Sequence, residues 1–525
     1  MAEQQQSTIY PLAMKAGIQR DGTKFATRNY IDGVWMRFQR GSPKKIGGFS
    51  DLRYFPPDTL GVPRGTIIVP YNGIYYQYFG DTQGIYCVVF NENFQAQDYF
   101  TNITPDGFVP SLNINWTFEA LYTTNSRSVT IIAHAGYDLF NLNERAVSPI
   151  YYGQVAEDVP FVATGQEVSG GMVVLPPYLI TLDNDGTIRI SSPNNPTDFP
   201  SSPAAARITS QKLIAGRETR GGQQAPAGLI WSLDTLMRLS YVGDPIIFRA
   251  DKVGKCSLMS KNAIAELDNL FFWAGTDRFM YYNGTINYLP NTQSTNFFFD
   301  NLNYEFREKV WATVVPHYNE IWFFFPMGDS TECNAAVIFN KAESAWYDTA
   351  LPTNRTCGYF DYSLNYPVWL SGVYDVTEEF PSIKVNIWVH ERGYDAVTYT
   401  NAYTAVTTAI PWAIETGNIA WCAIDAAGRW SGVERLVNIY RFEPDFIQSG
   451  NIYLTAKGKS YANAAVQSSD TFTIMPAIGA ALATQKVDIH FQQREMTLRF
   501  EGNDIGSYVE FGNCLIHIDF GDVRP

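Results

Sequence analysis

Short aromatic and β-branched runs, each ended by a turn signal, recur along the chain and constrain its fold more than any other feature. The clearest example is residues 269–285, where Leu270–Trp273 and Phe279–Tyr282 form two apolar runs separated by a turn. Asn283 and Gly284 then supply residues suited to the positive φ of a tight hairpin. A strand pair of this kind cannot bury both of its faces alone, so its repetition predicts an array of stacked sheets.

The repeats are uneven in length. Candidate units start near Ile68, Trp116, Met172, Leu229, Leu270, Val310 and Val368, so the longest spacings exceed the shortest by almost half. This drift indicates a degenerate repeat with insertions in loops. We therefore expect an all-β chain whose residues 51–404 form a β-propeller-like array of antiparallel blades, about six to eight in number.

The remaining signals are weaker. The best helix candidate is residues 301–309, and residues 202–213 are a second possibility. From about residue 405 the repeats fade and longer strand signals appear, so residues 405–525 are predicted to form a β-sandwich-like domain or strands that close the array. The small residues of 460–483 favour a loop there.

Residues 1–50, which we call the N-terminal segment, read as an extended arm and carry an excess of positive charge. They hold eight bases against three acids, a net +5, so residues 51–525 carry −19 of a total of −14. The bases are Lys15, Arg20, Lys24, Arg28, Arg37, Arg40, Lys44 and Lys45. A basic arm on an acidic body suggests docking to an acidic neighbour, with a solvated tail as the alternative. On the docking interpretation, residues 1–48 should be dispensable for folding.

Cysteine usage and hydropathy point to a protein made in a reducing cytoplasm. The six cysteines are far apart and none form CxxC pairs, so we expect free thiols rather than a disulfide framework. The N-terminus is polar, and no apolar run reaches the ~18 residues that would span a bilayer. We therefore expect no membrane insertion of its own.

No residue pattern predicts catalysis. The five histidines do not have metal-ligand spacing, and no nucleophile elbow or phosphate-binding loop occurs. Asp183 and Asp185 resemble the start of a calcium loop, but the glycine and the twelfth residue are misplaced, which favours a plain hairpin turn. We expect no cofactor and no enzymatic activity.

Seven segments, spread over residues 30–510, together resemble one protein family, the tail nozzle or tail-tube proteins of short-tailed bacteriophages. They are Tyr30–Phe38 with Gly41–Phe49, Ser192–Phe199, Ala227–Asp234, Phe272–Phe279, Glu320–Pro326, Glu443–Phe446 and Arg494–Asn503. The chain's ending, Phe520–Arg524, follows the family's usual close only loosely.

This resemblance implies a structural virion protein without covalent chemistry. It implies a β-propeller with added β domains, assembled as a homohexamer below the portal and adaptor, and a tail location after synthesis in the host bacterial cytoplasm. Double-stranded DNA would be retained in and ejected through the ring without sequence recognition, and tail fibres or spikes would be further partners. The residues that line the channel are not predicted, but an acidic lumen would let DNA slide, because it repels phosphates.

Two alternatives remain open. A propeller-type receptor- or glycan-binding tail protein would have exposed aromatic residues at one propeller mouth and no DNA-sized channel. A propeller hydrolase would have a carboxylate pair with a raised pKa in a central pocket.

Overall fold

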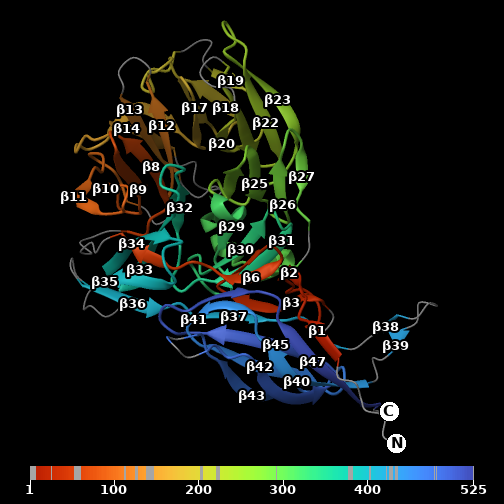
Figure 1. The fold of residues 1–525 in the computed structure, drawn as a ribbon. Helices are drawn as coiled ribbons and strands as arrows, with labels where there is room; N and C mark the ends of the chain where they lie inside the picture. Colours follow the sequence, from red (N-terminus) through yellow and green to blue (C-terminus); the bar gives the residue numbers. More distant parts are fainter. Residues whose placement is uncertain are drawn as a thin grey trace, which may run out of the picture.

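The computed structural model contains a ring of β-sheets above a second group of sheets, with strands of the N-terminal segment between them (Figure 1). It describes residues 8–523 except 25–26, 53–60, 111–113, 124–127, 137–146, 201–204, 220–224, 291–292, 376–381, 401–403, 421–422, 425–429, 432–434, 478 and 480–481.

Among the described residues the ring is a seven-bladed β-propeller of antiparallel sheets, within the expected range. The first three blades are β8–β11 (Gly65–Tyr71, Ile74–Gly80, Ile85–Phe90, Ala96–Asn102), β12–β15 (Asn115–Tyr122, Val129–Gly136, Ser148–Gln154, Val162–Val168) and β16–β19 (Met172–Leu175, Tyr178–Leu182, Thr187–Ile190, Ala205–Arg207). The next three are β20–β23 (Leu213–Thr219, Ala227–Ser232, Thr235–Tyr241, Phe248–Lys255), β24–β27 (Ile264–Leu267, Leu270–Ala274, Phe279–Tyr282, Ile286–Tyr288) and β28–β31 (Trp311–Val315, Glu320–Phe325, Ala335–Asn340, Ala345–Ala350).

The seventh blade combines both ends of the propeller sequence. Its strands β32, β33 and β34 (Cys357–Phe360, Pro367–Asp375, Ser382–His390) are completed by β7 (Phe49–Asp51), which pairs antiparallel with β34. The sheet then continues through β35 and β36 (Asp395–Tyr399, Ala405–Ala409). Strand β8 lies beside both β12 and β32, so the first and last blades are neighbours and the ring closes.

The C-terminal region is sandwich-like and borrows strands from the N-terminal segment. One sheet has the order β1-β47-β40-β44, with bounds Thr8–Pro11, Leu515–Val523, Arg435–Glu443 and Val487–Gln493. A second has the order β4-β37-β45-β42-β43, with bounds Asp32–Val34, Trp412–Glu415, Glu495–Gly502, Ile452–Lys459 and Gln467–Ile474. A third has the order β41-β46-β6-β5, with bounds Phe446–Ser449, Tyr508–Phe511, Ser42–Lys45 and Met36–Gln39.

Two small sheets and a few short helical elements complete the described chain. A parallel pair joins β2 (Lys15–Ile18) to β3 (Asn29–Tyr30), and a small hairpin joins β38 (Ala423–Ile424) to β39 (Trp430–Ser431). The helical elements are α1 (Thr295–Asn301) and the 3₁₀ turns η1 (Tyr304–Lys309) and η2 (Pro316–Tyr318). No helix within the described residues is long and apolar enough to cross a membrane.

One hydrophobic core connects the propeller to the C-terminal sheets. It contains tryptophans of blades six and seven and the inward-facing residues of β40, β42 and β45. Residues from the N-terminal segment, among them Trp35, Met36 and Phe38, are fully buried in the same core. Because these side chains fill the space between the two regions, the segment is an internal layer of the molecule.

Several local expectations are corrected by the structure. The expected arm, residues 1–50, contributes strands to three different C-terminal sheets and to blade seven. Residues 405–409 extend the sheet of blade seven, although the sequence places them in the C-terminal region. Among the described residues of 202–213, β19 replaces the expected helix, and β43 lies in the expected 460–483 loop. The helix expected over 301–309 is present as two short pieces, because α1 ends at Asn301 and the 3₁₀ turn η1 covers Tyr304–Lys309.

The repeat signal located all seven blades, at either the first or the second strand of each blade. Four of the seven expected unit starts lie within three residues of a blade's first strand, whereas Leu229, Leu270 and Val368 lie on second strands. Second strands are buried between neighbours on both sides, so their apolar runs are more continuous and stand out in the sequence. The hairpin of 269–285 is confirmed as β25 and β26, but its turn to β27 has three residues, and only Gly284 has a positive φ, +110°.

Candidate functional site

The first strands of six blades enclose a cavity of about 460 Å³ on the propeller axis, which we call the axial cavity. They are β8, β12, β20, β24, β28 and β32. At one end the wall consists of buried residues such as Trp116 and Trp311. At the other end Glu218, Glu266 and Tyr362 are exposed, and this end is the mouth. The volume lies in the range of small-molecule pockets.

The closed end is held by hydrogen bonds between blades. Asn262, in the loop before β24, donates to the side-chain oxygen of Asn115 on β12 at 2.7 Å. Arg217 on β20 donates to the backbone oxygen of Lys261 in the same loop at 3.2 Å. The loop before blade five is thereby tied to blades two and four, which fixes the floor of the axial cavity.

Carboxylates outnumber cations around the axial cavity. Among the described residues, its wall carries Glu119, Glu218, Glu266 and Asp361 and the guanidinium of Arg217. Burial raises the pKa of Glu119 to about 7, with Glu218 adding to the rise and Arg217 opposing it. Burial also raises the pKa of Glu218, and the nearby charge of Glu266 raises it further. Burial lowers the pKa of Arg217, whereas Glu119 and Glu266 lie close enough for both carboxylates to raise it in turn.

A second polar site lies where the N-terminal segment meets blade six, and we call it the junction. Arg37 on β5 is fully buried and forms ion pairs with Glu320 on β29 at 2.9 Å and with Glu391, which follows β34, at 2.7 Å. The ring of Tyr318 lies 3.6 Å from the guanidinium carbon. Burial alone would lower the pKa of Arg37, but the two carboxylates outweigh it and raise that pKa. Tyr347 also donates to Glu320.

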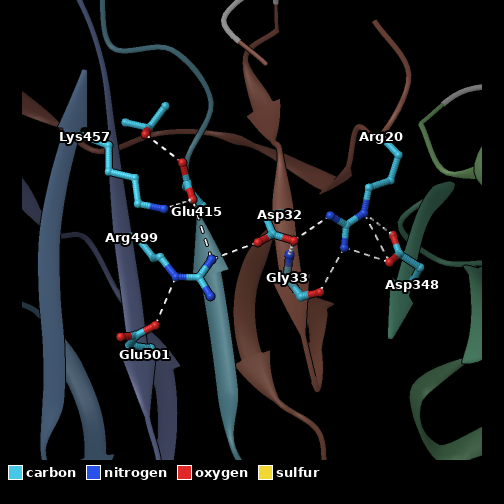
Figure 2. A network of polar contacts seen from close by, with 9 residues as sticks. Arg20, Asp32, Gly33, Asp348, Glu415, Lys457, Arg499 and Glu501 are labelled. Atoms are coloured by element: carbon cyan, nitrogen blue, oxygen red, sulfur yellow. Dashed lines mark hydrogen bonds and ion pairs between the residues drawn. The ribbon is translucent and has the colours of Figure 1, made fainter. Parts of the chain in front are cut away.

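The junction continues into the C-terminal sheets as a chain of ion pairs (Figure 2). Asp32 on β4 lies between Arg20 and Arg499, and contacts Arg499 on β45 at 2.8 Å. Arg20 reaches Asp348 on β31 at 2.8 Å, so the chain of ion pairs ends in blade six. On the other side Arg499 approaches Glu415, which contacts Lys457. Charged groups therefore connect propeller and C-terminal sheets through a strand of the N-terminal segment.

The eight bases of the N-terminal segment divide into two groups. Arg37 and Lys45 are buried, and Arg20 and Lys44 are partly buried in ion pairs. Burial lowers the pKa of Lys45 to about 8, and its amine donates to Ser507 and Tyr394. The exposed bases are Lys15, Lys24, Arg28 and Arg40.

Four of the seven segments described above for their resemblance to nozzle proteins contact one another at or near the junction. Arg37 and Asp32 belong to Tyr30–Phe38, Glu320 begins another such segment, and Arg499 lies in a third. Phe446, from Glu443–Phe446, also lies 5.9 Å from Phe500 between ring centroids. Residues far apart in the sequence that share the resemblance are thus brought into contact.

The other site candidates have structural roles. Asp183 pairs with Arg189 and Asp185 accepts from the backbone of Thr187, within the β17–β18 turn. Among the described residues no three His, Cys, Asp or Glu side chains are placed to hold a metal ion. The described cysteines, Cys87, Cys256, Cys333, Cys357 and Cys514, are free and buried, whereas Cys422 lies outside the described residues.

Sequence reasoning missed the polar residues of the axial cavity. On β12 the polar residues Thr117 and Glu119 alternate with Trp116 and Phe118, and this alternation was the available signal. That signal does not say which blades face one another across the axis, which depends on ring closure.

No protein-family model and no curated protein matches the chain. Several solved structures are similar to it. A chain of the crystal structure of BBS1N in complex with ARL6DN, soaked with mercury, has a TM-score of 0.39 and 10% identity, covering 66% of this chain and 97% of that one. The computationally designed Ika8 protein has a TM-score of 0.34 and 11% identity, covering 65% and 99%. BamB from Moraxella catarrhalis has a TM-score of 0.32 and 11% identity, covering 69% and 97%. The propeller assignment rests on the sheets described above.

Proposed function

We propose that this chain is a structural protein of the tail of a short-tailed bacteriophage, forming the nozzle ring below the portal and adaptor. The observation that carries the proposal is the meeting of nozzle-like segments at the junction, through Arg37 with Glu320 and Asp32 with Arg499. Buried charge pairs of this kind fix one arrangement of two regions, because a separated partner would be left uncompensated. A ring that holds pressurised DNA needs such a fixed arrangement.

On this proposal DNA passes between subunits and not through a propeller. The axial cavity, at about 460 Å³, has the volume of a small ligand site. A homohexamer would instead enclose a shared channel, with the net −19 of residues 51–525 lining much of its wall. Phosphates are repelled weakly by such a wall, which keeps the sliding of DNA fast.

Docking to the adaptor is assigned to the four exposed bases of the N-terminal segment. Lys15, Lys24, Arg28 and Arg40 stand outside the ion pairs that hold Arg20, Arg37 and Lys44 within the described part of the molecule. Exposed bases steer association with an acidic surface and make it sensitive to salt. Tail fibres or spikes are proposed as further partners, and the virion tail as the location.

Electron microscopy of the chain mixed with portal–adaptor rings tests the proposal. We expect a six-fold ring with an open axial channel wide enough for duplex DNA and lined by acidic residues. Changing the four exposed bases to glutamate should abolish attachment while leaving the fold intact. A matched control changes four exposed acids of the propeller to glutamine. Separate propellers at the particle periphery, or a net-positive channel, would contradict the proposal.

The second candidate is a propeller that binds or hydrolyses a ligand, and one observation favours it. Glu119 and Glu218 both line the axial cavity, and burial raises the pKa of each, which supports the carboxylate pair that a propeller hydrolase would need. Incubation of the purified chain with host-surface glycans tests it, and reducing-end release that is lost in Glu119→Gln would support a hydrolase.

A further inference from the structure

The net charge of the propeller changes sign between blades two and three. Residues 65–168, which span blades one and two, carry ten acids and two bases, a net −8. Residues 169–255, which span blades three and four, carry nine bases and seven acids, a net +2. Opposite charges on two sides of one molecule allow the acidic side of one copy to attract the basic side of another.

The acidic side has an exposed surface on the outermost strand of blade two, which we call the acidic patch. Strand β15 ends the sheet order β12-β13-β14-β15, so one of its edges is unpaired among the described residues. Val162 on β15 and Val159 in the loop before it are each more than half exposed. Asp158 accepts a hydrogen bond from Thr101 on β11 at 3.4 Å, so the patch reaches the outer strand of blade one. The exposed members of the patch are Glu157, Asp158, Val159, Val162 and Glu167.

A surface of similar build but opposite charge runs along the outer hairpin of blade four, and we call it the basic patch. Strand β23 ends the sheet order β20-β21-β22-β23, and the loop between β22 and β23 exposes more than half of Val242 and of Ile246. The hairpin holds four bases and two acids, one of which, Asp251, pairs with Arg249 at 2.8 Å. The exposed bases of the patch are Arg238, Arg249, Lys252 and Lys255.

Both patches combine exposed apolar side chains with charges beside them, which is typical of surfaces that bind protein. Two acidic patches would repel each other, and so would two basic patches, which disfavours a two-fold contact between copies. An acidic patch against a basic patch buries apolar side chains from both copies and places opposite charges together. Such a head-to-tail contact leaves one patch of each kind free at the ends, so further copies add until a ring closes. Strands β14 and β23 lie on different sides of the propeller, so one copy has room for a neighbour at each patch (Figure 1).

From this complementarity we propose that the acidic patch of one copy of the chain binds the basic patch of the next. The inference deepens the proposed nozzle function and rests on it for the closed ring, because it names the surfaces through which the copies join. The apolar side chains of the two patches form the centre of the contact. The carboxylates of Glu157 and Asp158 lie against the amines of Lys252 and Lys255.

Cross-linking of the full chain with a carbodiimide, which joins carboxylates directly to amines, tests this pairing. Isotope-labelled and unlabelled chains are mixed in equal amounts at low salt, so that links between copies carry both kinds of peptide. We expect such mixed links to join Glu157 or Asp158 to Lys252 or Lys255, and to fade as salt is added. Links between copies that involve only other residues would overturn the proposal, as would a chain that stays monomeric both in solution and on portal–adaptor rings.

Two charge-reversed variants supply a sharper comparison. Glu157→Lys with Asp158→Lys leaves both patches positive, and Lys252→Glu with Lys255→Glu leaves both patches negative. Each variant alone should associate about a hundredfold more weakly than the parent in analytical ultracentrifugation, because like charges then face each other. An equimolar mixture of the two should associate again, since every patch then meets one of opposite sign. Misfolding cannot explain a recovery that needs only mixing.

A matched control reverses two exposed acids outside both patches. Asp277→Lys with Asp329→Lys makes the same change in net charge as the acidic-patch variant and should associate as the parent does. Equal weakening by this control would overturn the proposal, and so would a mixture of folded variants that does not associate. A six-fold ring on portal–adaptor rings that ignores the reversals would remove this contact but leave the nozzle function. Recovery on mixing, without any ring on the portal, would support the contact and count against the nozzle function.

Discussion

The propeller and the C-terminal sheets differ in how far apart their paired strands lie in the sequence. Blade five, β24–β27, is assembled entirely from residues 264–288 by consecutive antiparallel pairs. Beneath it, β1 pairs with β47, so that Thr8 lies opposite Ile518, and β4 pairs with β37 through Val34 and Ala413. Blades one to six thus depend on local contacts, and the C-terminal sheets depend on contacts between the two ends of the chain.

This difference indicates which segment of the chain contributes most to the stability of the whole molecule. A blade gains its strand pairs at little cost in loop closure, since its strands are joined by short turns. The C-terminal sheets are complete only after the N-terminal segment has paired with them, and β7 also completes blade seven. Changes in the N-terminal segment should therefore affect the molecule more than equivalent changes in a blade.

Deletion of residues 1–48 should have the largest effect. It removes β4, β5 and β6 together with Trp35, Met36 and Phe38 from the shared core, so the C-terminal sheets should lose their cooperative fold. Hydrogen exchange should show β40–β47 unprotected while blades two to five stay protected. Deletion of residues 1–14, which removes only the edge strand β1, is the control and should leave most protection in place. Native protection of β40–β47 after the larger deletion would show that the N-terminal strands are dispensable.

Arg37→Ala should have the next largest effect. It leaves Glu320, fully buried, and the largely buried Glu391 without their cation. Breaking a buried ion pair from one side costs about 3–5 kcal/mol, most of it from the uncompensated charge. Urea denaturation should show a lower midpoint at an unchanged slope. Arg40→Ala, three positions away and exposed, is the control and should leave the midpoint unchanged. Equal effects of the two variants would contradict the prediction that the buried ion pairs of the junction stabilise the fold.

The sequence predicted the propeller well because its signal is local. An apolar run bounded by turn residues, such as Leu270–Trp273 before Gly275, is decided by the strand and its own hairpin. The longer strand signals expected from about residue 405 correspond to strands such as β42, Ile452–Lys459, for the same reason. Alternating polar and apolar residues and turn-forming residues predict that a segment is a strand, but they do not depend on which strand it pairs with.

What could not be predicted is the partner of a strand or of a charge. Arg37 and Arg40 look alike in sequence, yet one is buried against Glu320 and the other is exposed. The carboxylates of the axial cavity likewise come from different blades and meet only when the ring closes. Pairings over such distances are set by tertiary packing, which no local pattern records. For that reason the basic segment looked like a free arm.

Asp32→Asn should have a moderate effect that depends on pH. Burial would raise the pKa of Asp32, but Arg20 and Arg499 outweigh it and lower that pKa. A carboxylate with a lowered pKa stabilises the fold above its unfolded pKa of about 3.9, and this contribution is lost as the pH falls below it. We expect a loss of about 1 kcal/mol at pH 7, because the pair is partly exposed, and a smaller difference from the parent at pH 3. Asp329→Asn, an exposed turn residue, is the control, and a pH-independent loss in Asp32→Asn would contradict the role of its charge.

Arg278→Ala should have the smallest effect. It tests directly whether an ion pair within a blade stabilises the fold less than an ion pair at the junction. Arg278 pairs with its neighbour Asp277 at 2.6 Å, closer than the 2.8 Å between Asp32 and Arg499. The side chains of Arg278 and Asp277 are, however, both about half exposed. Water screens such a pair, and the two residues are adjacent in the chain, so no distant region depends on them. Thermal and urea midpoints should stay within experimental error of the parent. Arg278→Ala could instead lower the stability as much as Asp32→Asn does. Contact distance, rather than burial and separation along the chain, would then determine how much an ion pair contributes to the free energy of unfolding. In that case the contrast between blades and junction would have to rest on strand pairing alone.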